Sequence, residues 1–312
     1  DANQTVLDAI EVGEREAWAD HQYLDDDPTG TPSDVYVVTV TVTDDDTGSG
    51  VGAATVTVNN VDPVVSIDSI VDENGAVIGT DVDIAIIATQ VTLEGSFTDT
   101  GTLDTHTASI DWGDGIVDNL GTVVGSLSVT HIYWAPCECT ITLTVTDDDT
   151  GVGSATREIT VVDASGAIAN VIDRLLPSGD DPNVAAAINS LRGDDGGLDA
   201  NGALDMLEKD NLVAALRKIG QALQYLEAAE AAELALDLTH EKGLLALAAK
   251  SVAVIAVREA EAVASSPKDF LKWLTATVLI AQGDGLRLAP DFDFVGAVGK
   301  YLEAVRQVQG IR

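Results

Sequence analysis

The first 163 residues contain no lysine. They hold two arginines, Arg15 and Arg157, against 31 Asp and Glu residues. Because such a region has no basic patch to release counterions from phosphate, the sequence argues against nucleic acid and anionic lipid as partners. Residues 164–312 are closer to balance, with 21 acidic and 14 basic residues. The acidic half either attracts divalent cations or reflects life in high salt.

No stretch of the chain is apolar enough to predict a membrane span. The longest apolar run, residues 243–257, has 15 residues and contains Lys250, whereas a spanning helix needs about 20. We therefore expect a buried helix there. The chain begins at Asp1 and shows no signal-peptide pattern, so we expect any targeting segment to lie upstream.

Cysteine and aromatic residues are scarce as well. Cys137 and Cys139 are the only cysteines, and no zinc-binding spacing occurs. They can form a reduced pair, a local disulfide or a bond to another subunit, and outside the cell such close thiols tend to oxidise. The acidic surroundings, with Glu138 between them, argue against a redox-catalytic thiolate. Aromatics are 4% of the chain, so Val, Ile, Leu and Ala must fill the core.

The first half of the chain alternates between apolar and polar residues. Val and Thr alternate over residues 35–43 and 52–60, and the pattern returns over 140–146 and 155–162. This period of two is typical of half-buried antiparallel strands. Residues 81–88 and 91–97 are predicted as further strands. No helix is expected before residue 164, so this half is predicted to be all-β.

The second half has helical periodicity. A first helix should end near Pro177, and a second should begin with Asp181 as N-cap and Pro182 as first residue. Amphipathic stretches follow at 202–236, 239–264, 266–282 and 292–309. We expect breaks at Ser266-Pro267 and at Gly283-Asp284-Gly285. About six or seven helices of this kind predict an all-α bundle.

Three motifs, in order, carry a family resemblance. They are DWGDG at Asp111, Trp112, Gly113, Asp114 and Gly115, then HIY at His131–Tyr133, then a Val/Thr strand with an Asp-rich turn at 140–155. Together they resemble the polycystic kidney disease (PKD) domain, an Ig-like β-sandwich found mostly in extracellular surface proteins, adhesins and secreted depolymerases. The resemblance implies that Trp112 packs in the sandwich while its neighbours shape a tight turn. A sugar-binding role for Trp112 is the alternative.

Residues 1–61 repeat only the later half of this pattern. HQY recurs at His21–Tyr23, and the Asp triplet that starts at Asp147 has a counterpart at Asp44. The resemblance implies structural roles for both HxY motifs, that is for His21, Tyr23, His131 and Tyr133. We expect a partial PKD-like domain at 1–61, a complete one at 62–163 and the helical bundle at 164–312. The missing strands belong to a longer parent chain, lie divergent within residues 1–18, or come from a neighbouring subunit by strand addition.

The Asp triplets are candidate calcium sites. Alternate side chains of an extended segment share a face, so Asp44 can converge with Asp46, and Asp147 with Asp149. Carboxylate oxygens in a flexible Gly turn suit calcium, and residues 27–34 could add ligands to the first triplet. A solvated turn in which Asp caps backbone amides is the alternative. The acidic segment 193–202 fails calcium-loop spacing and is predicted to be a loop between helices.

The architecture favours a non-catalytic structural protein, extracellular or at the cell surface. No nucleophile elbow, zinc-protease, P-loop or dinucleotide motif occurs, so we expect no enzyme. The PKD-like sandwiches would act as a stalk or exchange strands. The helical domain would mediate self-assembly into a filament or surface layer with copies of the chain or other surface proteins, stabilised by Ca²⁺. The alternative is an adhesin or carbohydrate-binding accessory region of a larger secreted enzyme.

Overall fold

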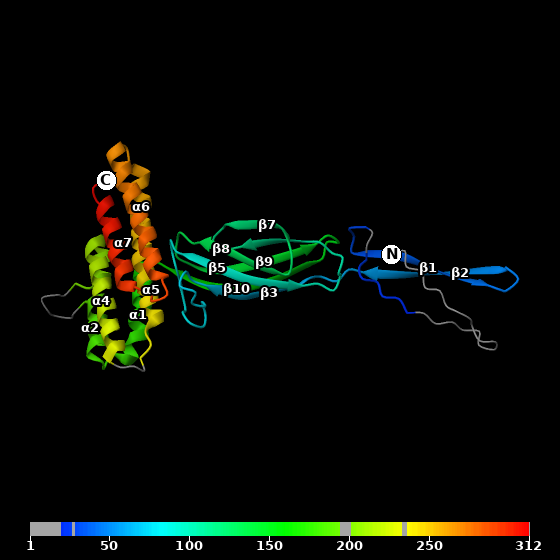
Figure 1. The fold of residues 1–312 in the computed structure, drawn as a ribbon, viewed down its shortest axis with the longest axis horizontal. Coiled ribbons are helices and arrows are strands. Elements are labelled where there is room, and N and C mark those ends of the chain that lie inside the picture. Colours follow the sequence, from blue (N-terminus) through cyan, green and yellow to red (C-terminus); the bar gives the residue numbers. More distant parts are fainter. Residues whose placement is uncertain (1–19, 27–28, 194–200, 233–235, 312) are drawn as a thin grey trace. The chain divides into compact units, whose positions relative to one another are not determined.

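The computed structural model describes residues 20–26, 29–193, 201–232 and 236–311 (Figure 1). Strands come first and helices follow, as the sequence predicts. The strands are β1 Ser33–Thr43, β2 Ser49–Asn59, β3 Val64–Val71, β4 Ala85–Ile86, β5 Gln90–Thr98, β6 His106–Asp111, β7 Val117–Val123, β8 Ser126–Ile132, β9 Cys137–Asp147 and β10 Val152–Val162. The α-helices are α1 Ala164–Leu175, α2 Pro182–Arg192, α3 Ala203–Glu208, α4 Leu212–Ala232, α5 Thr239–Val263, α6 Pro267–Arg287 and α7 Phe294–Val308. None of the described helices is long and apolar enough to cross a membrane.

The strands form three sheets. β1 pairs with β2 alone among the described strands, and the others form a five-stranded sheet in the order β4-β10-β9-β6-β7 and a three-stranded sheet in the order β3-β5-β8. Alternate residues of β9 are buried, namely Cys139, Ile141, Leu143 and Val145. This alternation is what one buried sheet face requires, and it confirms the β-sandwich predicted for this region.

The β1–β2 and β9–β10 hairpins have the same turn. Asp44 N donates to Gly48 O over 2.9 Å, and Asp147 N donates to Gly151 O over 3.1 Å. Thr47 and Thr150 hold the same left-handed position, with φ of 74° and 75°. The repeated sequence therefore folds into one hairpin type twice, in agreement with the expectation that residues 1–61 repeat the later half of the PKD-like pattern.

Two expected element boundaries are wrong in the β region and the bundle. The strand predicted at 81–88 shrinks to the two residues of β4, because Asp81 turns the chain by accepting a 2.9 Å bond from Val77 N. The helix predicted over 202–236 divides into α3 and α4, because Asp210 takes a left-handed φ of 55°.

The break predicted at Gly283-Asp284-Gly285 is also wrong, since α6 continues to Arg287. A Cβ on Gly283 would lie 2.4 Å from Tyr301 Cε1. Glycine is thus present there because α6 and α7 approach closely, and the helix tolerates it. The predicted start of α2 is confirmed, with the Asp181 side chain accepting from Asn183 N and Val184 N ahead of Pro182.

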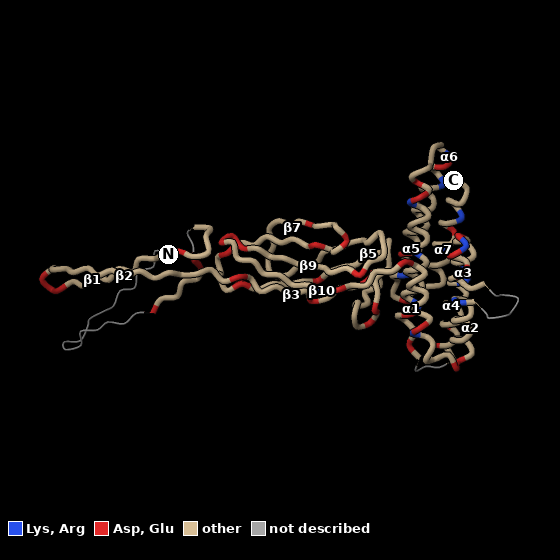
Figure 2. Tube along the Cα trace, turned by 180° about the vertical axis from the view of Figure 1, so that it is seen from behind, with Lys and Arg blue, Asp and Glu red and all other residues tan. Residues whose placement is uncertain are grey.

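Contacts divide the chain into two compact units, described separately below. The first unit comprises residues up to 68, 94–127 and 141–157, and the second comprises 69–93, 128–140 and 158–312. Acidic residues are spread along the strands, whereas Lys and Arg lie almost only on the helices (Figure 2).

Candidate functional site

The first Asp of each triplet accepts a hydrogen bond from the backbone of its own turn. Asp44 Oδ1 accepts from Gly48 N at 2.6 Å, and Asp147 Oδ1 accepts from Gly151 N at 2.6 Å. Asp147 Oδ2 also accepts from Asn60 Nδ2 at 2.8 Å. Asp46 is exposed, and among the described residues neither it nor Asp44 belongs to a cluster of metal-ligand atoms. Among the described residues, no group of three or more ligand atoms forms around Asp44 or Asp46, and no such group contains Asp147. The calcium sites expected at Asp44 and Asp46 and at Asp147 and Asp149 stay predictions.

Asp149 instead meets carboxylates from other loops of the first unit. Its oxygens lie within 4.8 Å of those of Asp25 and Asp26, and a second group joins it to Asp104 and Asp148 at the same separation. We call these five residues the acidic cluster. Sequence reasoning missed all but Asp149, although a third Asp triplet begins at Asp25.

The carboxylates of the acidic cluster disfavour one another's charge. Burial raises the pKa of Asp104 to about 8, helped by the hydrogen bond and repulsion from Asp25. Burial, followed by repulsion from Asp26 and Asp25, raises the pKa of Asp149 to about 6. Burial is also the main cause that raises the pKa of Asp26. A cation bound at such a site would stabilise the charged form of its carboxylates.

A third group of possible ligands has a different chemistry. Asp99, Asp104 and His106 share the 4.8 Å limit. His106 Nε2 lies 2.9 Å from Asp99 Oδ2, and Asp99 Oδ1 accepts from Gly101 N at 3.1 Å. Asp99 and His106 therefore already satisfy each other.

The DWGDG and HxY residues lie in structural positions. Trp112 is fully buried and donates from Nε1 to Asp118 Oδ2 over 2.8 Å, so its ring offers no face to a sugar. Asp111 Oδ1 accepts from Gly113 N at 2.9 Å, and Asp114 Oδ1 accepts from Ile116 N at 3.0 Å, which holds the turn through Gly115.

The two HxY motifs have one geometry. The rings of His131 and Tyr133 meet edge to face with centroids 4.6 Å apart, and those of His21 and Tyr23 do the same at 4.6 Å. Cys137 and Cys139, which follow the second motif, are joined in a disulfide. The remaining candidate loop, residues 193–202, lies largely outside the described residues, as do residues 27 and 28 of the segment 27–34.

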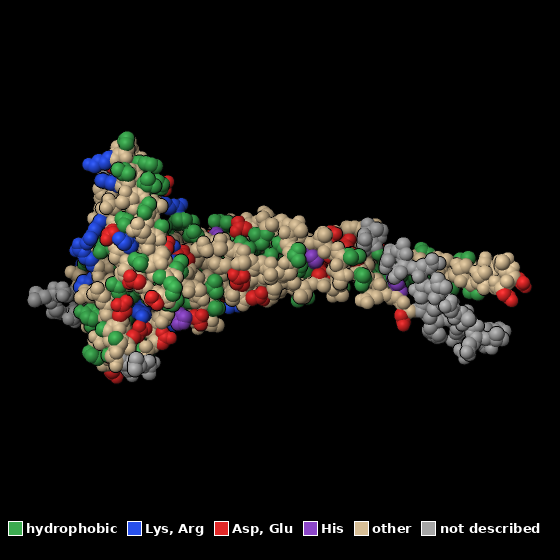
Figure 3. Space-filling model, viewed as in Figure 1, with side chains coloured by type: hydrophobic (Ala, Val, Ile, Leu, Met, Phe, Trp, Pro, Cys, Tyr) green, Lys and Arg blue, Asp and Glu red, His purple; other side chains and the backbone are tan. Residues whose placement is uncertain are grey.

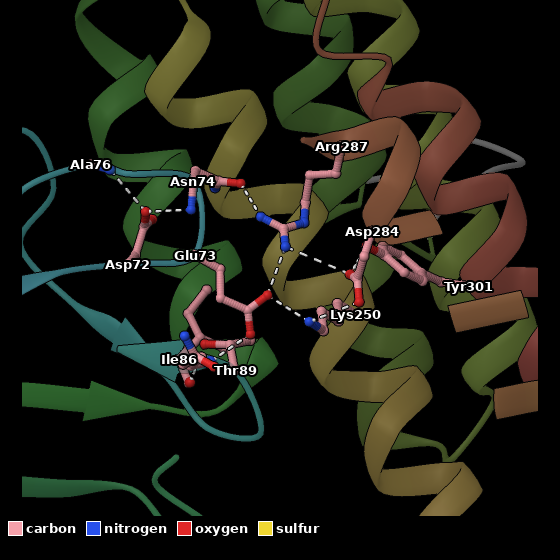
Figure 4. Close-up of polar contacts among 11 residues, drawn as sticks. Asp72, Glu73, Asn74, Ala76, Ile86, Thr89, Lys250, Asp284, Arg287 and Tyr301 are labelled. Carbon is pink, nitrogen blue, oxygen red and sulfur yellow. Dashed lines mark hydrogen bonds and ion pairs between the residues drawn. The ribbon is translucent and has the colours of Figure 1, made fainter. Parts of the chain in front are cut away.

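A buried ion network lies in the second unit (Figure 4). Arg287 of α6, whose side chain is 1% exposed, pairs with Glu73 at 2.6 Å and with Asp284 at 3.6 Å, and it donates to Asn74. Lys250 of α5 pairs with the same two carboxylates, at 2.5 Å to Glu73 and 3.1 Å to Asp284. Two cations and two anions thus join the turn after β3 to α5 and α6.

Two further arginines of the helices reach residues of the β region within the second unit. Arg174 of α1 donates to the Asp81 carbonyl at 3.1 Å and lies 3.4 Å from Asp83. The guanidinium of Arg258 lies 3.8 Å from the ring centroid of Trp134. The helices therefore bring basic residues to loops of the β region, which has few of its own.

Among the exposed apolar side chains of the described residues, two groups are aligned on single elements. On β1, Val38, Val40 and Val42 share one face of the hairpin and are 41%, 56% and 55% exposed. We call this the hairpin face. On α6, Phe270, Leu274 and Val278 follow one another every four residues and are 57%, 44% and 50% exposed. We call this the α6 stripe, and Figure 3 shows hydrophobic side chains over this part of the helices.

A pocket lies between the helices of the described chain. It measures about 340 Å³ and is lined by Leu212, Ala256, Glu259, Ala260, Val263, Val305, Val308, Gln309 and Ile311. Glu259 is the only ionisable side chain among these residues. The pocket is a gap between apolar helix faces. Its lining residues do not include a nucleophile paired with a general base.

The comparison with protein families matches residues 75–162 to the PKD domain. The match covers the strands from β4 to β10 and confirms the resemblance drawn from the DWGDG and HIY motifs. The comparison with curated proteins finds no match.

Proposed function

We propose, from the PKD domain at residues 75–162, that the protein is a non-catalytic structural component of an extracellular surface. PKD domains are typical of extracellular and cell-surface modules and are not themselves catalytic. In this role the β region is a stalk, and copies of the chain associate with one another. The protein's partners are then further copies of itself.

The hairpin face carries this proposal. Aligned on the Asp triplets, Val38, Val40 and Val42 occupy the positions of Ile141, Leu143 and Val145 in the second copy. The latter three are fully buried by the strands of the PKD domain, whereas the former are about half exposed. Because a two-stranded hairpin is marginally stable in water, this face gains most from being covered.

Strands of a second copy fit the hairpin face best. The chain already contains strands that bury an equivalent face, so a neighbouring copy can offer a surface of matching chemistry by strand addition. The α6 stripe offers a second self-association surface, because apolar residues every four positions suit packing against another helix. Net repulsion between acidic copies opposes the contact, so added salt should favour it.

The test compares two lysine substitutions on neighbouring residues of β1. Val40→Lys places a charge on the hairpin face, and Thr41→Lys places the same charge on the opposite face of the same strand. Sedimentation velocity and electron microscopy across salt and calcium concentrations should show assembly of the unmodified chain and of T41K, and loss of assembly in V40K.

Three outcomes would count against the proposal. One is an unmodified chain that stays monomeric under every condition. Another is equal assembly of V40K and T41K, which would exclude the hairpin face. The third is a monomeric chain whose first unit unfolds in V40K and not in T41K, because the face would then be covered by its own chain.

A further inference from the structure

The acidic cluster is built from three segments that are distant in the sequence. Asp25 and Asp26 follow the first HxY motif, Asp104 lies between β5 and β6, and Asp148 and Asp149 lie in the β9–β10 turn. Backbone contacts hold the segments together: Thr102 N donates to Leu24 O over 3.0 Å, and the backbone of Thr31 hydrogen bonds to the Asp149 side chain. All these residues belong to the first unit.

The buried side chain of Asp26 indicates a ligand independently of the clustering of carboxylates. Its side chain is directed into the cluster, within 4.8 Å of the oxygens of Asp25 and Asp149, and the residue is 1% exposed. Neither of its carboxylate oxygens has a hydrogen-bond partner among the described residues. Buried carboxylates are ordinarily paired, hydrogen-bonded or bound to a metal.

No cationic side chain among the described residues of the first unit is placed to serve the cluster. Arg157 is the only Lys or Arg among the described residues of that unit, and no ion pair joins it to these five carboxylates. The described residues of the first unit therefore supply no compensating charge to the cluster. A metal ion is the partner that fits oxygens gathered within 4.8 Å of one another.

The donor set selects the class of metal. All five residues offer carboxylate oxygens, and none offers nitrogen or sulfur, which disfavours zinc and copper. The carboxylates form two groups of three that share Asp149, and such oxygens on turns suit the irregular shell that calcium accepts. Magnesium requires a small octahedral shell and keeps its water.

We propose that Asp25, Asp26, Asp104, Asp148 and Asp149 bind calcium. The ion would fasten the segment after the first HxY motif to two turns of the PKD domain. This site differs from the one expected within each triplet, since only Asp149 is common to both. It concerns the single chain and holds whether or not copies assemble.

The two hairpins supply a matched control. Asp148 and Asp149 correspond to Asp45 and Asp46 in the β1–β2 turn. D148N/D149N and D45N/D46N therefore remove the same two charges from the same turn, once inside the acidic cluster and once outside it. D26N removes the buried carboxylate without touching either hairpin.

Calcium and magnesium are titrated calorimetrically into the full chain after EDTA treatment, with circular dichroism as the check of folding. Calcium should bind and raise the unfolding temperature, and magnesium should do so weakly. D148N/D149N and D26N should each lower the calcium affinity about tenfold or more, while D45N/D46N keeps it.

Several results would overturn the site. They are no calcium binding by the folded chain, equal binding of magnesium, or equal losses in D45N/D46N and D148N/D149N, which would indicate diffuse attraction to an acidic surface. If D148N/D149N fails to fold, D26N decides alone, because unchanged affinity in a folded D26N variant refutes the proposal.

Discussion

The buried network around Glu73 gives the sharpest stability prediction. Its four charged groups are balanced, with Glu73 and Asp284 against Lys250 and Arg287. Glu73→Gln leaves two cations facing Asp284 alone, and the Arg287 side chain is only 1% exposed. Breaking a buried pair by removing one partner costs about 3–5 kcal/mol. We expect a loss near the lower end, about 3 kcal/mol, because the Glu73 side chain retains 11% exposure and Asp284 still compensates.

Arg287→Met should cost a similar amount, because Lys250 then faces two carboxylates. The double variant E73Q/R287M keeps the Lys250–Asp284 pair at 3.1 Å and restores the balance of charge. Its loss of free energy of unfolding should therefore be smaller than the sum of the single losses by about 2 kcal/mol. Urea denaturation followed by helical circular dichroism reports on the second unit, which contains all the described helices.

An exposed pair on α7 provides the control. Lys300 and Glu303 lie 3.1 Å apart, with side chains 34% and 49% exposed. E303Q and K300M make the same chemical changes in water, where such pairs contribute at most about 1 kcal/mol. The reasoning is refuted if E73Q costs no more than E303Q, or if the double variant E73Q/R287M loses the full sum of its singles.

Three further predictions concern single positions. Gly153→Ala should lower the free energy of unfolding by about 1–3 kcal/mol, because the new Cβ would lie 1.9 Å from Pro63 O. Gly50→Ala is the control at the equivalent position, where a Cβ would meet nothing within 4 Å and should change the stability little. Equal effects of the two substitutions in urea denaturation would contradict this prediction. Thr150→Asn should raise the urea midpoint and increase the free energy of unfolding by up to about 1 kcal/mol, because the β-branched Thr150 holds a φ of 75° that Asn tolerates better. A lowered midpoint would show that the turn needs Thr. Burial raises the pKa of Asp72 above its ordinary value, so the folded chain favours the protonated carboxyl. As the pH rises from about 4 through the raised pKa, the native chain should therefore lose stability relative to the Asp72→Asn variant. Parallel profiles of stability against pH for the two proteins would refute the shift.

Local patterns made the fold largely predictable. Alternation of Val and Thr defines the strands whichever domain they join, and Asp181 ahead of Pro182 marks a helix start by chemistry confined to adjacent residues. Where the predicted boundaries were wrong, the cause was a tertiary contact that the local sequence does not show. Gly283 continues a helix because Tyr301 packs on it from α7, and no local signal carries that information.

The acidic cluster could not be predicted for the same reason. Asp26 and Asp149 are 123 positions apart in the sequence, and each lies in a triplet that resembles an ordinary solvated turn. Their meeting depends on where the segment after the first HxY motif runs. Carboxylates are so abundant in residues 1–163 that composition alone cannot distinguish a cluster from a surface.

The scarcity of basic residues on the strands has a consequence for cleavage by proteases. Trypsin-like proteases cleave after lysine and arginine, and residues 16–156 contain neither. Arg157 is half-buried within β10, where the ladder of the sheet holds its backbone away from a protease cleft. Apart from Arg15, such an enzyme would find its accessible cleavage sites among the helices, and the strands would remain as one uncut piece.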